Sequence, residues 1–100
     1  MPKKRKQSKP PEMTRLFYSG GTWKGIRRGL VDAYDSAADH KKRPLGALIN
    51  VIDAAGACNQ YFSDVEMTVK QRALIYRHIS GLPNSDRVRE LAEQQEAETE

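Results

Sequence analysis

The apolar residues recur at steps of three and four through the middle of the chain, and this spacing predicts helices. The first predicted helix covers about 22–40 and has Thr22 as its N-cap. Its apolar face is formed by Trp23, Ile26, Leu30, Tyr34 and Ala37. The second covers about 44–62, with Pro44 at its first position. It is apolar on nearly every side, which is typical of a helix that neighbours cover.

A third helix is predicted over about 64–80 from the spacing of Ser63 and Glu66, which is that of a capping box. Gly81 is a typical left-handed stop for this helix. Either Asn84 or Ser85 then provides the N-cap of a fourth helix.

The fourth predicted helix covers about 85–95 and uses Val88, Leu91 and Ala92. Residues 14–18 form a short extended candidate, which we expect to pack irregularly. No stretch alternates between apolar and polar residues over a longer distance, so the predicted fold class is all-α. The prediction is a small four-helix domain over 13–91 with short connections.

Length and composition restrict the class of protein further. One hundred residues support one domain. No apolar run reaches the ~18 residues of a membrane-spanning helix, and the basic N-terminus has no apolar signal region, so we expect an intracellular protein. The single Cys58 excludes an internal disulfide, and with only two histidines it cannot complete a closed zinc site. No metal site, cofactor or catalytic residue is predicted, and we expect the protein not to be an enzyme.

The charge is distributed unevenly. Residues 1–30 contain nine basic residues and one acidic residue, whereas the other seventy contain eight basic and twelve acidic residues. The segment 1–12 is basic, rich in proline and almost free of large apolar residues, which predicts a disordered arm. The segment 92–100 is predicted to be an acidic tail that frays from the fourth helix.

Three groups of basic residues are the candidate binding residues, because they can contact the phosphates of DNA or RNA. They comprise the arm residues Lys3, Lys4, Arg5, Lys6 and Lys9, a second group of Arg15, Lys24, Arg27 and Arg28, and a third of Lys41, Lys42 and Arg43 in the predicted loop between the first two helices. Aromatic residues interleave with the second group and would add base stacking if they were exposed. Within the arm, residues 2–6 are also similar to a nuclear import signal, so the expected location is the nucleus for a protein of a eukaryote or its virus and the cytoplasm otherwise.

The segment from Met67 through Gly81 and Asn84 to Leu91 resembles the first two helices of a LuxR-type helix-turn-helix. That family places a third, basic helix in the major groove, whereas this chain ends in an acidic segment. The resemblance therefore reflects similar helix capping, and no function is transferred from it.

Two functions are consistent with these patterns. The first is a small non-enzymatic nucleic-acid-associated protein that binds phosphate backbone through its arm and basic helix surface. The alternative is a helical protein-interaction or assembly module, such as a viral or phage accessory protein or a subunit of a complex. The nearly apolar second helix favours the alternative, because self-association or a partner would cover it.

Overall fold

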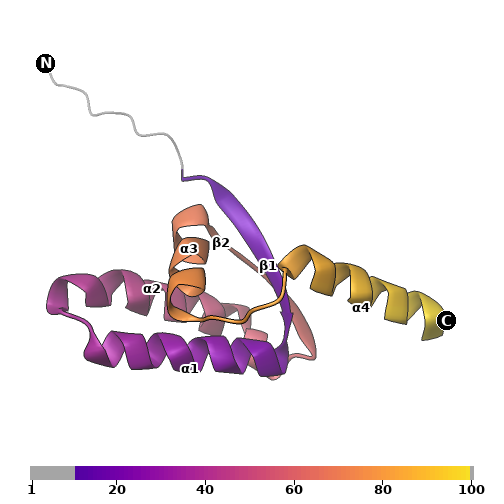
Figure 1. The fold of residues 1–100 in the computed structure, drawn as a ribbon, viewed down its shortest axis with the longest axis horizontal. Coiled ribbons are helices and arrows are strands. Elements are labelled where there is room, and N and C mark those ends of the chain that lie inside the picture. The colour runs from indigo at the N-terminus through magenta and orange to yellow at the C-terminus, as the bar shows by residue number, and fades with distance from the viewer. Residues whose placement is uncertain (1–10, 100) are drawn as a thin grey trace, which may run out of the picture.

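The computed structural model describes residues 11–99, which form four α-helices, a short 3₁₀ helix and a two-stranded antiparallel sheet (Figure 1). The predicted all-α fold class is therefore wrong, and the described chain is mixed α and β. The elements follow in the order β1 (Met13–Ser19), α1 (Gly20–Ser36), α2 (Asp39–Ala55), η1 (Ala57–Asn59), β2 (Phe62–Thr68), α3 (Val69–His78) and α4 (Ser85–Thr99).

The sheet joins two segments that are separated in the sequence by α1 and α2. Its register places Leu16 opposite Val65 and Phe17 opposite Asp64. Successive side chains of a strand point to opposite faces. The buried inner face therefore holds alternate residues, which are Leu16 and Tyr18 of β1 and Ser63, Val65 and Met67 of β2. The sequence led us to expect that residues 14–18 pack irregularly, and this expectation is wrong. They form a regular strand, because pairing with β2 satisfies their backbone groups.

The start of the third predicted helix is wrong, because residues 62–68 are strand β2. The spacing of Ser63 and Glu66 indicated a capping box, but both residues lie in the strand. The capping box is one step further on: the Thr68 hydroxyl accepts from the Gln71 backbone N–H, and the Gln71 side chain accepts from the Thr68 N–H, both at 3.0 Å. Thus α3 begins only at Val69, and the segment that resembled a helix-turn-helix starts on a strand.

The boundaries of the first two helices also differ from the prediction. Ser19, not Thr22, caps α1, since its hydroxyl accepts from the Thr22 N–H at 3.2 Å. The predicted loop 41–43 lies in the first turns of α2, so Pro44 is inside that helix rather than at its first position. Gly56, with φ of 66°, ends α2 in the left-handed conformation that glycine adopts without steric cost. Gly81 also has positive φ, as its predicted role requires, although α3 ends earlier at His78.

The core lies between the inner face of the sheet and helices α1, α2 and α3. Trp23, Ile26 and Leu30 of α1 are fully buried, which agrees with the apolar face that their spacing predicted. Trp23 also donates from its indole N–H to the Ser63 carbonyl at 3.1 Å, so a buried polar group is satisfied. The inner face of the sheet adds Leu16, Tyr18, Val65 and Met67.

Helix α4 projects away from this body (Figure 1). Asn84 caps it, since its side-chain oxygen accepts from the N–H groups of Asp86 and Arg87 at 2.9 and 3.2 Å. The helix continues past residue 95 to Thr99, beyond its predicted end. Residues 1–10, which carry most of the predicted arm, lie outside the described residues. None of the helices within 11–99 has both the length and the apolar character needed to cross a membrane.

Candidate partner-binding groove

The outer face of the sheet carries a row of three aromatic side chains. Phe17 of β1 and Phe62 of β2 stack with ring centroids 5.4 Å apart and planes 9° apart. Tyr61 then meets Phe62 edge to face, at 5.3 Å and 75°. Its side chain is 89% exposed, which is unusual for a ring of this size. We call Phe17, Phe62 and Tyr61 the aromatic row.

The start of α1 holds one end of this row in place. Gly20 donates its backbone N–H to the Tyr61 carbonyl at 3.0 Å. A Cβ at Gly20 would collide with the backbone carbonyl of Gln60, so glycine is required for this approach. The Ser63 hydroxyl donates to the Gln60 side chain at 3.0 Å, which ties down the same turn. The position of Tyr61 is therefore set by backbone contacts rather than by burial of its ring.

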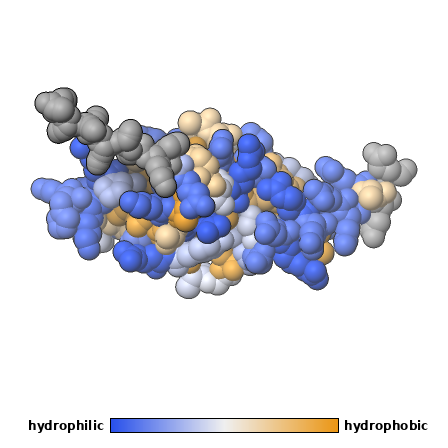
Figure 2. Space-filling model, turned by 90° about the horizontal axis from the view of Figure 1, so that it is seen from above, coloured by the Kyte–Doolittle hydropathy of each residue, from blue (hydrophilic) through white to orange (hydrophobic). Residues whose placement is uncertain are grey.

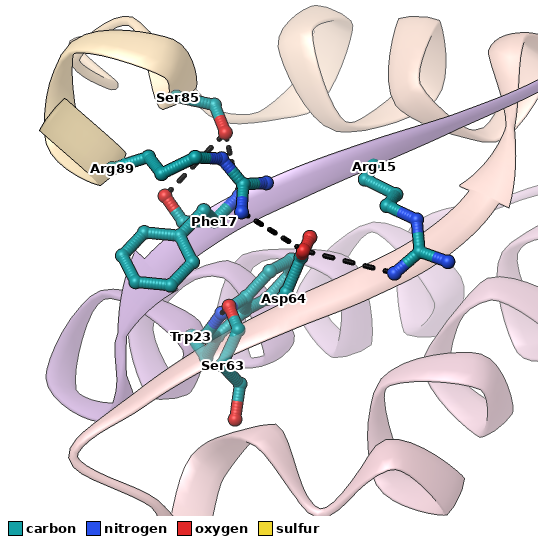
Figure 3. Close-up of polar contacts among 7 residues, drawn as sticks. All are labelled: Arg15, Phe17, Trp23, Ser63, Asp64, Ser85 and Arg89. Carbon is teal, nitrogen blue, oxygen red and sulfur yellow. Dashed lines mark hydrogen bonds and ion pairs between the residues drawn. The ribbon is translucent and has the colours of Figure 1, made fainter. Parts of the chain in front are cut away.

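Helix α4 forms the second side of the site and is anchored to β1 by Ser85 (Figure 3). The Ser85 side chain is buried, and its hydroxyl oxygen accepts from the Phe17 backbone N–H at 2.5 Å. The same hydroxyl lies 3.5 Å from the Phe17 carbonyl oxygen, to which it donates. Ser85 thus satisfies both backbone groups that Phe17 presents at the free edge of β1, which an edge strand otherwise leaves unpaired.

Asp64 links the sheet to α4 by charge. Its carboxylate lies 3.0 Å from an Arg89 guanidinium nitrogen and 3.7 Å from one of Arg15 (Figure 3). The hydrogen bond from Arg89 to Asp64 raises the pKa of the arginine, so it stays charged. Arg89 also lies over the Phe17 ring, with its guanidinium carbon 5.0 Å from the centroid. One ring face of Phe17 therefore contacts Arg89, and Phe17 is stacked on Phe62 as well.

One oxygen of Asp64, Oδ1, is buried and has no hydrogen-bond partner among the described residues. Burying an unsatisfied carboxylate oxygen costs free energy. Two cations on the other oxygen offset that cost, so Asp64 is held by Arg15 and Arg89 together.

Between the aromatic row and α4 is an open groove of about 850 Å³. Its lining comprises the aromatic row and, from α4, Arg89, Ala92, Glu93, Gln95 and Glu96. The aromatic side is apolar, whereas the α4 side carries two carboxylates and one arginine that is already ion-paired. In Figure 2 hydrophilic side chains dominate the end of the molecule where α4 lies.

The structure brings together some of the predicted basic residues but not all of them. Of the second predicted group, Lys24, Arg27 and Arg28 line one open hollow on α1, whereas Arg15 does not. Asp32 and Asp53 line the same hollow. Arg27 is engaged by Asp53 through two hydrogen bonds of 2.7 and 3.2 Å, which raise the pKa of the arginine. This hollow is therefore of mixed charge.

The other predicted basic groups lie elsewhere. Arg15 is on the outer face of the sheet, ion-paired with Asp64. Residues 41–43 come after the C-terminal end of α1. At the ordinary rise of an α-helix, that end lies about 18 Å along the helix axis from Lys24. There Lys42 donates to the Tyr34 carbonyl at 3.0 Å and lies over the Tyr34 ring. The arm residues Lys3, Lys4, Arg5, Lys6 and Lys9 lie outside the described residues.

Sequence reasoning missed the groove because it assigned its residues to helices. Tyr61 and Phe62 were predicted to end the second helix, and Asp64 to begin the third. The sequence signal for strand β2 is the alternation of polar and apolar residues from Asp64 through Val65 and Glu66 to Met67, which has the period of a strand. Four residues of alternation were outweighed by the capping-box spacing in the same segment.

Comparison of the chain with protein-family models, with curated proteins and with solved structures finds no match.

Proposed function

We propose that this protein is a protein-interaction module and that its groove binds a segment of a partner polypeptide. The observation that carries the proposal is the aromatic row, which ends in the almost fully exposed Tyr61 and forms one side of an open groove. Exposed aromatic side chains next to a concave surface are typical of the centre of protein interfaces. The projecting α4 supplies the other side.

The charges of the groove favour a polypeptide over a nucleic acid. Glu93 and Glu96 line it and would repel phosphate, and the charge of Arg89 is offset by Asp64. Phe17 leaves little surface for a base, because it is already covered by Arg89 and stacked on Phe62. Binding of phosphate backbone through the arm stays a prediction that rests on residues 3–9.

The same charges define the partner segment. An aromatic or large aliphatic side chain would pack on Tyr61 and Phe62, removing their exposed surface from water. A lysine or arginine of the partner would face Glu93 at the α4 side of the groove. The partner is thus a short segment with at least one large apolar and one basic side chain.

The test is a selection of 12-residue peptides from a random display library on the full chain, followed by affinity measurement for the enriched peptides. We expect enriched peptides to combine aromatic and basic residues. Tyr61→Ala and Glu93→Lys should each weaken their binding by at least about tenfold. The control is Leu91→Ala, which alters an exposed apolar side chain of α4 outside the groove.

Two outcomes would overturn the proposal. One is that no peptide is enriched, or that the enriched peptides bind Tyr61→Ala as tightly as the parent. The other is that a single-stranded oligonucleotide binds with a steep salt dependence that Tyr61→Ala removes, since this would make the row a base-stacking surface. A third outcome would support both functions. If salt-dependent binding of the oligonucleotide is lost only when Lys3, Lys4, Arg5 and Lys6 are changed to alanine, the arm binds nucleic acid and the groove binds the peptide.

A further inference from the structure

A second concave site lies between α1, α2 and α3 and shares no residue with the groove. We call it the corner pocket, because it sits where α1 ends and α2 begins. Its volume is about 540 Å³, within the range of pockets that hold small molecules. Its apolar lining comes mainly from Ala33, Ala37, Pro44, Leu45 and Leu74.

The titratable side chains that line the corner pocket are all basic. Lys41 comes from α2, and Arg77 and His78 come from α3. No aspartate or glutamate is among the described residues that line it. The third predicted basic group thus contributes Lys41 to a cluster whose other members were not predicted as binding residues.

These basic side chains differ in their lack of a partner from four arginines of the described chain. Arg15, Arg27, Arg87 and Arg89 are each ion-paired with a carboxylate. Within residues 11–99, the structure shows no hydrogen bond or ion pair from the side chains of Lys41, Arg77 or His78. An anion placed in the corner pocket would meet the positive charges of Lys41 and Arg77, and no carboxylate among the described lining residues would compete.

We propose that the corner pocket binds a small carboxylate that carries an apolar chain or ring. The apolar part would cover Leu45 and Leu74, and the carboxylate would lie between Lys41 and Arg77. The planar guanidinium of arginine matches the two oxygens of a carboxylate. A bare anion gains nothing from the apolar lining, and an uncharged chain gains nothing from the basic residues, so the lining selects a molecule that has both parts.

The test is a titration of the full chain with sodium octanoate, followed by two-dimensional amide NMR. We expect shift changes that centre on the residues of the corner pocket and saturate. Octanol, which has the chain without the charge, and inorganic phosphate, which has charge without the chain, should each bind at least about tenfold more weakly than octanoate.

Matched variants separate the site from general charge attraction. Arg77→Gln should weaken octanoate binding by about tenfold, whereas Arg87→Gln, on α4 outside the pocket, should leave it unchanged. Equal binding of octanol, equal binding of phosphate, or an Arg77→Gln variant that binds like the parent would each overturn the proposal. Because the pocket and the groove share no residue, Tyr61→Ala should not alter octanoate binding, and either proposal can fail without the other.

Discussion

Helices α1 and α4 have similar lengths, 17 and 15 residues, but very different positions in the molecule. Helix α1 buries Trp23, Ile26 and Leu30 at successive turns, so one whole stripe of it lies in the core. Of the α4 side chains that the structure describes, only Ser85 is buried, and Leu91 remains 47% exposed. Helix α1 therefore packs on the core along its whole length, whereas α4 is attached to the body at one end only.

The difference shows how a small domain forms both a stable body and an open binding surface. Most of the stability of a helix in a protein comes from packing of its apolar face, and α1 has such a face. Helix α4 is fixed instead by the hydroxyl of Ser85 and the ion pair of Arg89 with Asp64. Its outer turns therefore stay clear of the body and leave room for the groove.

The largest expected effect comes from removing the central side chain of α1. Trp23→Ala should lower the free energy of unfolding by about 3–5 kcal/mol, because it leaves a cavity and an unsatisfied Ser63 carbonyl. Urea unfolding followed by circular dichroism measures the change. A loss below about 1 kcal/mol would show that α1 is not the helix on which the fold depends.

A smaller and local effect is expected from Ser85→Ala. The Phe17 N–H at the sheet edge would lose its partner, which costs about 1–3 kcal/mol. Hydrogen exchange should speed up for the amides of α4 and of Phe17 and stay unchanged for those of α1. Ser80→Ala, an exposed change in the connection before α4, is the control. Equal acceleration in α1 and α4 would mean that the two helices form one cooperative unit.

The smallest effect at neutral pH is expected from Tyr18→Phe. Tyr18 donates its hydroxyl to the Pro83 carbonyl at 2.7 Å, just before α4, so its removal should cost about 1 kcal/mol. Burial, with a smaller contribution from Tyr76, raises the pKa of Tyr18 above its ordinary value of 10.0.

The pH dependence of Tyr18→Phe follows from that shift. The hydroxyl stays protonated in the folded protein after it ionises in the unfolded chain, so the parent protein loses stability as the pH rises above about 10. Unfolding measured between pH 8 and pH 11 should show a shallower loss for Tyr18→Phe than for the parent. Parallel curves for the two proteins would contradict a raised pKa.

Helical spacing was a reliable guide where a helix buries a continuous face. The core positions of α1 were predicted from local pattern alone and agree with the structure, and of the two predicted caps of α4, Asn84 and Ser85, the structure uses Asn84. Both depend on residues within a few positions of one another. The ends of α2 and the start of α3 were not predicted, because Ser63 and Glu66 satisfied a helix rule that their strand partners overrode.

The candidate sites show the same limit. Lys24, Arg27 and Arg28 line one hollow because a single helix carries them, whereas Arg15 of the same predicted group lies on the sheet. The aromatic row and the corner pocket each combine residues from separate elements, such as Phe17 with Phe62 and Lys41 with Arg77. No local pattern connects residues so far apart in the chain, so neither site was predicted.

The sequence by itself determined which stretches can bury a helical face, which residues of α1 form its buried stripe, and that charge is divided unevenly between the two parts of the chain. Only the tertiary structure decided that residues 13–19 and 62–68 pair as strands, that Tyr61 stays exposed and that basic residues of α2 and α3 line one pocket. The physical reason is that helix hydrogen bonds close within four residues, whereas a strand is completed by a partner whose distance along the chain no local pattern records.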